Sequence, residues 1–141
     1  LDAADGNWTG LAEETILGHV HLSVADLDAT RDFYTKVLDY RVVNDKYNKA
    51  LFVSTGKYHH HLTFNVWYSE NGYPAPANAV GLKSFTIVLK DEAYGDEVRD
   101  KLKAADYPVE IYDDGPQYSG KQNFSTVDVN GFRILFMVEG E

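Results

Sequence analysis

A short pattern that recurs after 65 residues is the feature that most restricts how this chain can fold. In segments 17–24 and 82–89, polar and apolar residues alternate as in a β-strand with one buried face. Each segment is followed by an aspartate that can cap a helix, Asp26 in the first case and Asp91 in the second. The sequence therefore predicts two copies of one supersecondary unit, related by a pseudo-twofold axis and sharing a cleft.

Each copy is predicted to contain one strand, one helix and three further strands. In the first copy these lie at residues 16–25, 27–38, 40–46, 49–55 and 58–67. In the second copy they are a strand at 82–90, a helix after Asp91, and strands at 107–112, 121–128 and 132–138, with Asn130-Gly131 as a hairpin turn. The stretch 69–78 is a loop between the copies. We expect a leader or interdomain linker at 1–15 and one domain at 16–141, divided into modules at 16–68 and 80–141.

Charge and composition exclude several classes of partner. The net charge is -9 and no Lys/Arg cluster is present, so we expect binding to neither nucleic acid nor anionic membranes. The chain has no cysteine, which excludes disulfides and thiolate sites. It shows neither a membrane-spanning apolar run nor a signal-peptide pattern, so we expect a cytoplasmic location. The first residue is Leu1 rather than methionine, so we expect a piece of a longer protein.

Histidines are concentrated in two of the predicted strands. Strand alternation places one set of polar side chains on a single face of the 58–67 segment: His59, His61, Thr63, Asn65 and Trp67. The same alternation places His60 with the apolar residues of the opposite face. In the 16–25 segment, His19 and His21 share a face with Ser23. Two His-x-His strands in one short chain predict a pocket with metal or acid–base chemistry.

Several motifs give the chain a resemblance to a known superfamily. They are Gly18-His-Val-His-Leu-Ser-Val-Ala-Asp-Leu27, Asp32-Phe-Tyr-Thr-Lys-Val-Leu-Asp-Tyr40, Tyr58-His-His-His-Leu-Thr-Phe-Asn-Val-Trp67 and Val80-Gly-Leu-Lys-Ser-Phe-Thr-Ile87. The first two resemble the vicinal oxygen chelate superfamily, which includes glyoxalase I, extradiol dioxygenases and bleomycin-binding proteins. The last two narrow the resemblance to the C-terminal half of catechol-2,3-dioxygenase-like proteins. The resemblance implies an α+β fold in which two βαβββ modules form a partly open, cupped eight-stranded sheet with helices outside.

The resemblance also implies a set of metal ligands, which this sequence completes only in part. Dioxygenases of the family hold Fe(II) with two histidines and one glutamate. His19 matches the first histidine, but Ser84 stands at the second ligand position and Leu135 at the glutamate. His61 matches a further histidine, which is the acid–base residue in dioxygenases and a ligand position in glyoxalases, with His60 as the adjacent option. The implied iron triad is therefore incomplete.

Two functions follow from these residues. The first is a ring-cleaving, catechol-2,3-dioxygenase-like enzyme in which His19 and His61 serve the metal and His61 serves as acid–base residue. The second is a non-catalytic domain that binds a small, aromatic or amphipathic molecule, as bleomycin-binding proteins do. In either case we expect the ligand to contact His21, His59, Asn65, Trp67 and Ser84.

The cofactor and the assembly are open at this stage. Beside Fe(II), a cluster on one face would suit Zn(II), Ni(II) or Cu(II), and its members would be His19, His21, His59 and His61. His19 and His61 are also compatible with hydrogen-bonded pocket residues in a protein without any metal. A missing N-terminal half or a second copy of the chain is the expected macromolecular partner.

Overall fold

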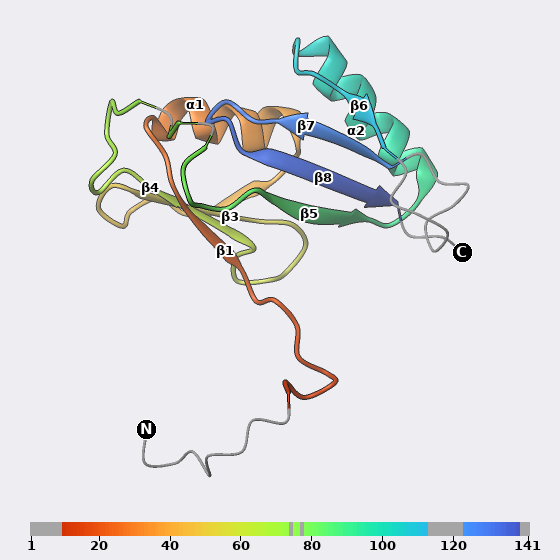
Figure 1. Cartoon of the computed structure of the whole chain (residues 1–141), viewed down its shortest axis with the longest axis horizontal. Helices are drawn as coiled ribbons and strands as arrows, with labels where there is room; N and C mark the ends of the chain where they lie inside the picture. The colour runs from red at the N-terminus through yellow and green to blue at the C-terminus, as the bar shows by residue number, and fades with distance from the viewer. Residues whose placement is uncertain (1–9, 74, 77, 113–122, 139–141) are drawn as a thin grey trace.

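The elements of the chain follow the predicted order in both copies (Figure 1). The computed structural model describes residues 10–73, 75–76, 78–112 and 123–138. Its elements are β1 (Val20–Ser23), α1 (Leu27–Asp32), the π-helical segment η1 (Phe33–Val37), β2 (Arg41–Asn44), β3 (Ala50–Ser54), β4 (Leu62–Asn65), β5 (Ser84–Leu89), α2 (Glu92–Ala104), β6 (Glu110–Ile111), β7 (Phe124–Val127) and β8 (Arg133–Val138). Residues 1–9 of the expected linker and residues 121–122 of an expected strand lie outside the described residues.

The strands of the described residues form two four-stranded sheets with the same internal order. The first sheet has the order β1-β4-β3-β2 and the second has the order β5-β8-β7-β6. In each sheet the opening strand pairs in parallel with the last strand of its unit, β1 with β4 and β5 with β8. The remaining pairs are antiparallel. The predicted α+β class with two βαβββ units is confirmed.

Both helices begin where the sequence predicts. The Asp26 carboxylate accepts hydrogen bonds from the backbone N–H groups of Asp28, at 2.8 Å, and Ala29, at 3.0 Å. The Asp91 carboxylate accepts one from the backbone N–H of Tyr94 at 2.7 Å. Each aspartate therefore satisfies donors that the first helical turn leaves without an intrahelical partner.

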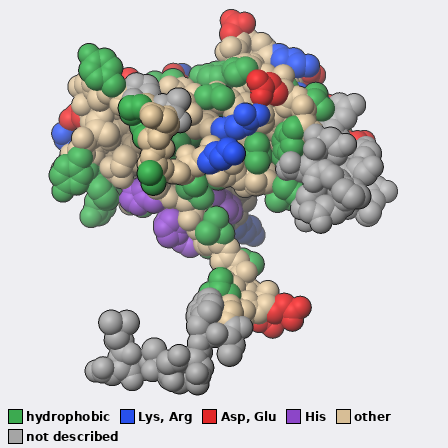
Figure 2. All heavy atoms as spheres, in the orientation of Figure 1, with side chains coloured by type: hydrophobic (Ala, Val, Ile, Leu, Met, Phe, Trp, Pro, Cys, Tyr) green, Lys and Arg blue, Asp and Glu red, His purple; other side chains and the backbone are tan. Residues whose placement is uncertain are grey.

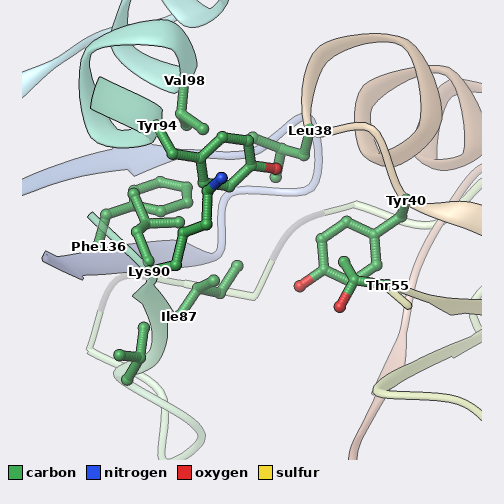
Figure 3. A pocket seen from close by; sticks show the side chains of 10 residues that line it. Leu38, Tyr40, Thr55, Ile87, Lys90, Tyr94, Val98 and Phe136 are labelled. Atoms are coloured by element: carbon green, nitrogen blue, oxygen red, sulfur yellow. The ribbon is translucent and has the colours of Figure 1, made fainter. Parts of the chain in front are cut away.

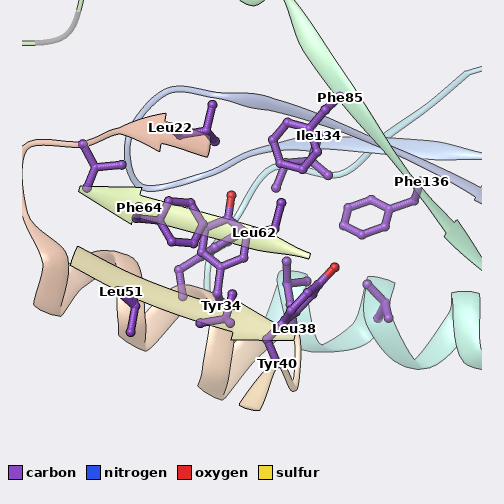
Figure 4. Packing of buried hydrophobic residues seen from close by; sticks show 14 of the residues in the cluster. Leu22, Tyr34, Leu38, Tyr40, Leu51, Leu62, Phe64, Phe85, Ile134 and Phe136 are labelled. Atoms are coloured by element: carbon purple, nitrogen blue, oxygen red, sulfur yellow. The ribbon is translucent and has the colours of Figure 1, made fainter. Parts of the chain in front are cut away.

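The core lies between the helices and the two sheets, and both modules contribute to it (Figure 4). The Tyr34 ring, from the π-helical segment η1, packs on Phe64 with the ring centroids 4.5 Å apart. Its hydroxyl donates a hydrogen bond to Asp128 of the second module at 2.9 Å. Phe33 packs edge-on against Tyr107 at 4.6 Å. The segment η1, which continues α1, thus contributes Phe33 and Tyr34 to the second module as well as to its own sheet.

No helix in the described ranges combines the length and the apolar character that crossing a bilayer requires.

Candidate functional site

The pairing of β1, β4 and β3 builds a polar face on the first sheet. His21 and Phe52 are both register partners of Thr63, so the three lie in one row across the strands. Leu22 and Phe64 form a pair on the opposite, buried face. The His21 Nε2 atom lies 2.9 Å from the Asn65 side-chain nitrogen, within hydrogen-bond distance. The predicted separation into an apolar and a polar face therefore holds along β4 itself.

Three histidines meet at the beginning of this face, and they are not the expected set. The side chains of His19, His59 and His60 each offer a ring nitrogen, and these atoms all lie within 4.8 Å of one another. Figure 2 shows histidine side chains gathered on the side of the body from which the N-terminal segment leaves. The placement of His60 on the core face is wrong. β4 begins only at Leu62, so strand alternation does not extend back to residue 60.

His60 lies between the polar face of the sheet and the other two rings. Its centroid is 4.6 Å from that of His19, 4.4 Å from that of His59 and 5.2 Å from that of Phe52. Burial lowers the pKa of His60, and the charges of the neighbouring histidines lower it further. A neutral imidazole keeps a lone pair on one ring nitrogen, which is the form that binds a metal.

The His61 ring contacts residues at the end of β3 and not the histidine cluster. Its Nδ1 atom lies 2.9 Å from the Ser54 hydroxyl and accepts a hydrogen bond from the Thr55 backbone N–H at 3.3 Å. Because a backbone N–H only donates, a neutral His61 in this arrangement carries its proton on Nε2. Burial lowers its pKa, with the charge of His59 as the smaller cause. His61 is thus held apart from the other three by its own partners.

The second sheet carries the positions where the resemblance implies the remaining iron ligands. Ser84 is the register partner of Arg133, and Leu135 is the register partner of Thr86. These four residues therefore share one face of β5 and β8. Leucine offers no ligand atom, and a serine hydroxyl is a poor replacement for imidazole at Fe(II). The residues present do not fit the iron triad that the resemblance implies.

Arg133 is a residue of this face that the sequence analysis did not single out. Its guanidinium donates to the Ser125 hydroxyl at 3.0 Å and to the Glu110 carboxylate at 2.9 Å. Arg133 is two residues before Leu135 in β8, so strand alternation places both on the same face. This spacing is the sequence feature from which its position could have been predicted.

A cavity with a volume of about 610 Å³ lies where the end of β1 meets the start of α1, residues 79–83 and the turn after β7. Its polar lining includes His21, Ser23, Lys83 and Asn130, and much of the rest is apolar, including Val80, Leu82 and Phe132. Ligand pockets generally have volumes of about 300–1,000 Å³ and predominantly apolar walls with a few polar groups. Both modules contribute walls to this cavity.

A smaller cavity of about 250 Å³ lies between the modules on the helix side (Figure 3). Tyr40 and Thr55 of the first module line it together with Ile87, Tyr94 and Phe136 of the second. Burial raises the pKa of Tyr40 to about 12, so its hydroxyl stays protonated at neutral pH. The volume of this smaller cavity, about 250 Å³, is below the usual range for a ligand pocket.

Comparisons with known proteins agree with this architecture. The sequence pattern of the Glyoxalase/Bleomycin resistance protein/Dioxygenase superfamily matches residues 16–134, and the chain belongs to this superfamily. Catechol-2,3-dioxygenase of Bacillus subtilis (strain 168) is 43% identical over 110 residues, which are 77% of this chain and 39% of that protein. The chain thus spans about two fifths of the length of that relative.

Among solved structures, lactoylglutathione lyase from Agrobacterium tumefaciens superposes with a TM-score of 0.63 at 23% identity, over 90% of this chain and 96% of that one. A variant of the fosfomycin resistance protein FosX from Listeria monocytogenes, crystallised with Mn(II) and 1S,2S-dihydroxypropylphosphonic acid, superposes with a TM-score of 0.64 at 15% identity, over 87% of this chain and 89% of that one. At these identities the likeness establishes the fold alone.

Proposed function

We propose that this chain is a small-molecule-binding domain whose ligand occupies the 610 Å³ cavity, without ring cleavage at the family's iron positions. The observation that carries the proposal is the cavity itself, which both modules line and which combines apolar walls with a few polar groups. Ser84 and Leu135 support the non-catalytic half of the proposal, because together with His19 they offer one imidazole where iron needs three strong ligands.

The expected ligand is an aromatic or amphipathic molecule. Its apolar part would pack on Phe132 and Leu82, while His21 and Lys83 would receive its polar group. Asn65 and Trp67 would orient the His21 ring instead of contacting the ligand. The Asn65 amide is within hydrogen-bond distance of that ring, and the Trp67 indole packs edge-on against it with the centroids 5.5 Å apart. His59 and Ser84 are not part of the cavity lining, so their proposed contact with the ligand would require a larger molecule that reaches onto the sheet faces.

Filling the cavity should remove ligand binding, and Gly81 offers a matched pair of variants. A Cβ added at Gly81 meets no atom within 4 Å, so Gly81→Ala should be tolerated, while Gly81→Phe adds a bulky ring at the cavity wall. With anilinonaphthalene sulfonate as an amphipathic probe, Gly81→Phe should weaken binding by about tenfold or more, equivalent to about 1.4 kcal/mol. Fluorescence titration of the parent and both variants is the measurement. Equal affinity in all three proteins would exclude this cavity as the ligand site.

A second candidate function is ring cleavage, which the 43% identity to a catechol-2,3-dioxygenase favours. In that case His61 would be the acid–base residue, and a metal would be held by His19 with His61 or by another set of ligands. Because the match covers 39% of that relative, this activity would also involve the part of the relative that the match does not cover.

Catechol turnover distinguishes the two candidates. Protein loaded anaerobically with Fe(II) and then exposed to catechol and air should form no yellow ring-opened product, because the iron positions lack two ligands. The Bacillus subtilis relative is the positive control under the same conditions. Sustained product formation by this chain would support the enzymatic candidate and reject the proposed one.

We further propose a cytoplasmic location and completion of the assembly by a second half or a second copy of the chain.

A further inference from the structure

We infer that His19, His59 and His60 form a three-histidine site for a divalent metal of the Zn(II), Ni(II) or Cu(II) class, separate from Ser84 and Leu135. The proposed function does not specify a metal cofactor, and this site names one set of residues that would hold it. Ligand binding in the cavity does not depend on it.

Hydrogen bonding separates these three histidines from the other two. The chain has five histidines in total. His21 lies within hydrogen-bond distance of Asn65, and His61 is engaged by Ser54 and Thr55. Within the described part of the chain, no hydrogen bond or ion pair involves a ring nitrogen of His19, His59 or His60. Their lone pairs therefore remain available to a cation.

The backbone holds the three residues near one another before any metal binds. The Val20 backbone N–H donates a hydrogen bond to the His61 carbonyl at 3.0 Å. Because His19 precedes Val20 and His60 precedes His61, this bond brings the backbones of His19 and His60 close together. His59 adjoins His60 in the chain, and Phe52 packs edge-on against the His60 ring at 5.2 Å. The ligands thus come from two segments that a strand pairing joins, so the backbone of the fold brings them together before a metal binds.

The distances require only side-chain movement. The ligand atoms lie within 4.8 Å of one another, whereas nitrogens that bind one tetrahedral zinc ion at 2.0–2.1 Å are about 3.4 Å apart. His19 and His59 are exposed and His60 is partly buried, so rotation of the side chains can close the difference. An exposed site of three imidazoles leaves a fourth position for water or an added ligand.

The donor set selects the metal. Imidazole nitrogens suit Zn(II), Ni(II) and Cu(II), while Mg(II), Ca(II) and Mn(II) prefer carboxylate and carbonyl oxygens. The triad of non-haem Fe(II) oxygenases includes a carboxylate, which this cluster lacks.

Equilibrium dialysis against Zn(II) with elemental analysis tests the site, on the full chain prepared without a polyhistidine tag or a nickel column. The parent should bind one zinc ion per chain. His19→Ala and His60→Ala should each weaken binding by at least tenfold, and the matched controls His21→Ala and His61→Ala should retain it. Circular dichroism in EDTA verifies that every variant is folded. Lack of saturable binding by the parent, or undiminished binding by His60→Ala, would overturn the inference.

Imidazole ¹⁵N spectra provide a second readout that does not depend on any variant. Zinc should shift the ring nitrogens of His19, His59 and His60 and leave those of His21 and His61 in place. Shifts confined to His21 and His61 would contradict the assigned ligands. Loss of the metal site would leave the Gly81→Phe result unaffected, so the two proposals fail independently.

Discussion

In the variant that combines Ser84→His with Leu135→Glu, added metal should raise the free energy of unfolding through a new site at residues 84 and 135. β5 and β8 place residues 84 and 135 on one face of adjacent strands, and the resemblance to dioxygenases implies that His19 is the third ligand. With metal at about a hundred times its dissociation constant, the folded state gains about 2.7 kcal/mol, or about 5–10 °C in melting temperature. Thermal unfolding with and without Fe(II) or Mn(II) is the measurement.

The experiment belongs in a His60→Ala background, so that the three-histidine cluster does not contribute while His19 remains. Leu135→Glu alone should lower stability by about 1–2 kcal/mol, since it introduces a carboxylate at a half-buried position. The single variants are the controls, and metal should rescue only the double variant. If metal stabilises the double variant no more than its parent, residues 84 and 135 do not converge with His19.

Asp128→Ala should be among the most destabilising single substitutions, at about 3 kcal/mol. The carboxylate is buried and accepts hydrogen bonds from the backbone N–H groups of Phe132 at 2.8 Å and Asn130 at 2.9 Å. It also accepts one from the Tyr34 hydroxyl at 2.9 Å. Removing it leaves that buried hydroxyl without a partner and frees the turn before β8. Urea unfolding of the variant against the parent measures the loss.

Tyr34→Phe is the matched control, since it removes the same inter-module hydrogen bond from the other side. If the bond carries the effect, the double variant should be less destabilised than the sum of the two single variants. Strict additivity would show that Asp128 acts only through its own turn.

The same carboxyl predicts a pH dependence. Burial raises the pKa of Asp128 above its ordinary value of 3.8, and the hydrogen bonds it accepts oppose this only in part. The folded state therefore holds the proton more tightly than the unfolded state, and this contribution to stability falls as pH rises from 3.8 through the folded pKa. Asp128→Asn should remove that part of the slope. Unfolding free energies of both proteins across this interval test the sign.

The parts of the fold that the sequence predicted correctly depend on short-range sequence patterns. Alternation and the two aspartate caps predicted the element order, because each depends on neighbours within a few residues. His60 was misassigned because its neighbours suggested a longer strand than the backbone forms. Strand ends depend on pairing with distant segments, which a single sequence does not reveal.

The site required tertiary information of the same kind. The selection of His59 and His60 over His21 and His61 depends on hydrogen bonds to Asn65 and Ser54, which lie elsewhere in the sheet. Arg133 gains its significance only from the register of β5 with β8. The cavity is formed by segments from both modules, and its volume follows from packing.

The bond between Tyr34 and Asp128 also bears on how the protein discriminates among ligands. A hinge between the modules would have to break this buried contact and separate Phe33 from Tyr107. Widening the cavity by that route therefore costs the same interactions that maintain the folded state. We expect the walls from the two modules to keep a constant spacing, so that the cavity selects by the size of the ligand group that enters it.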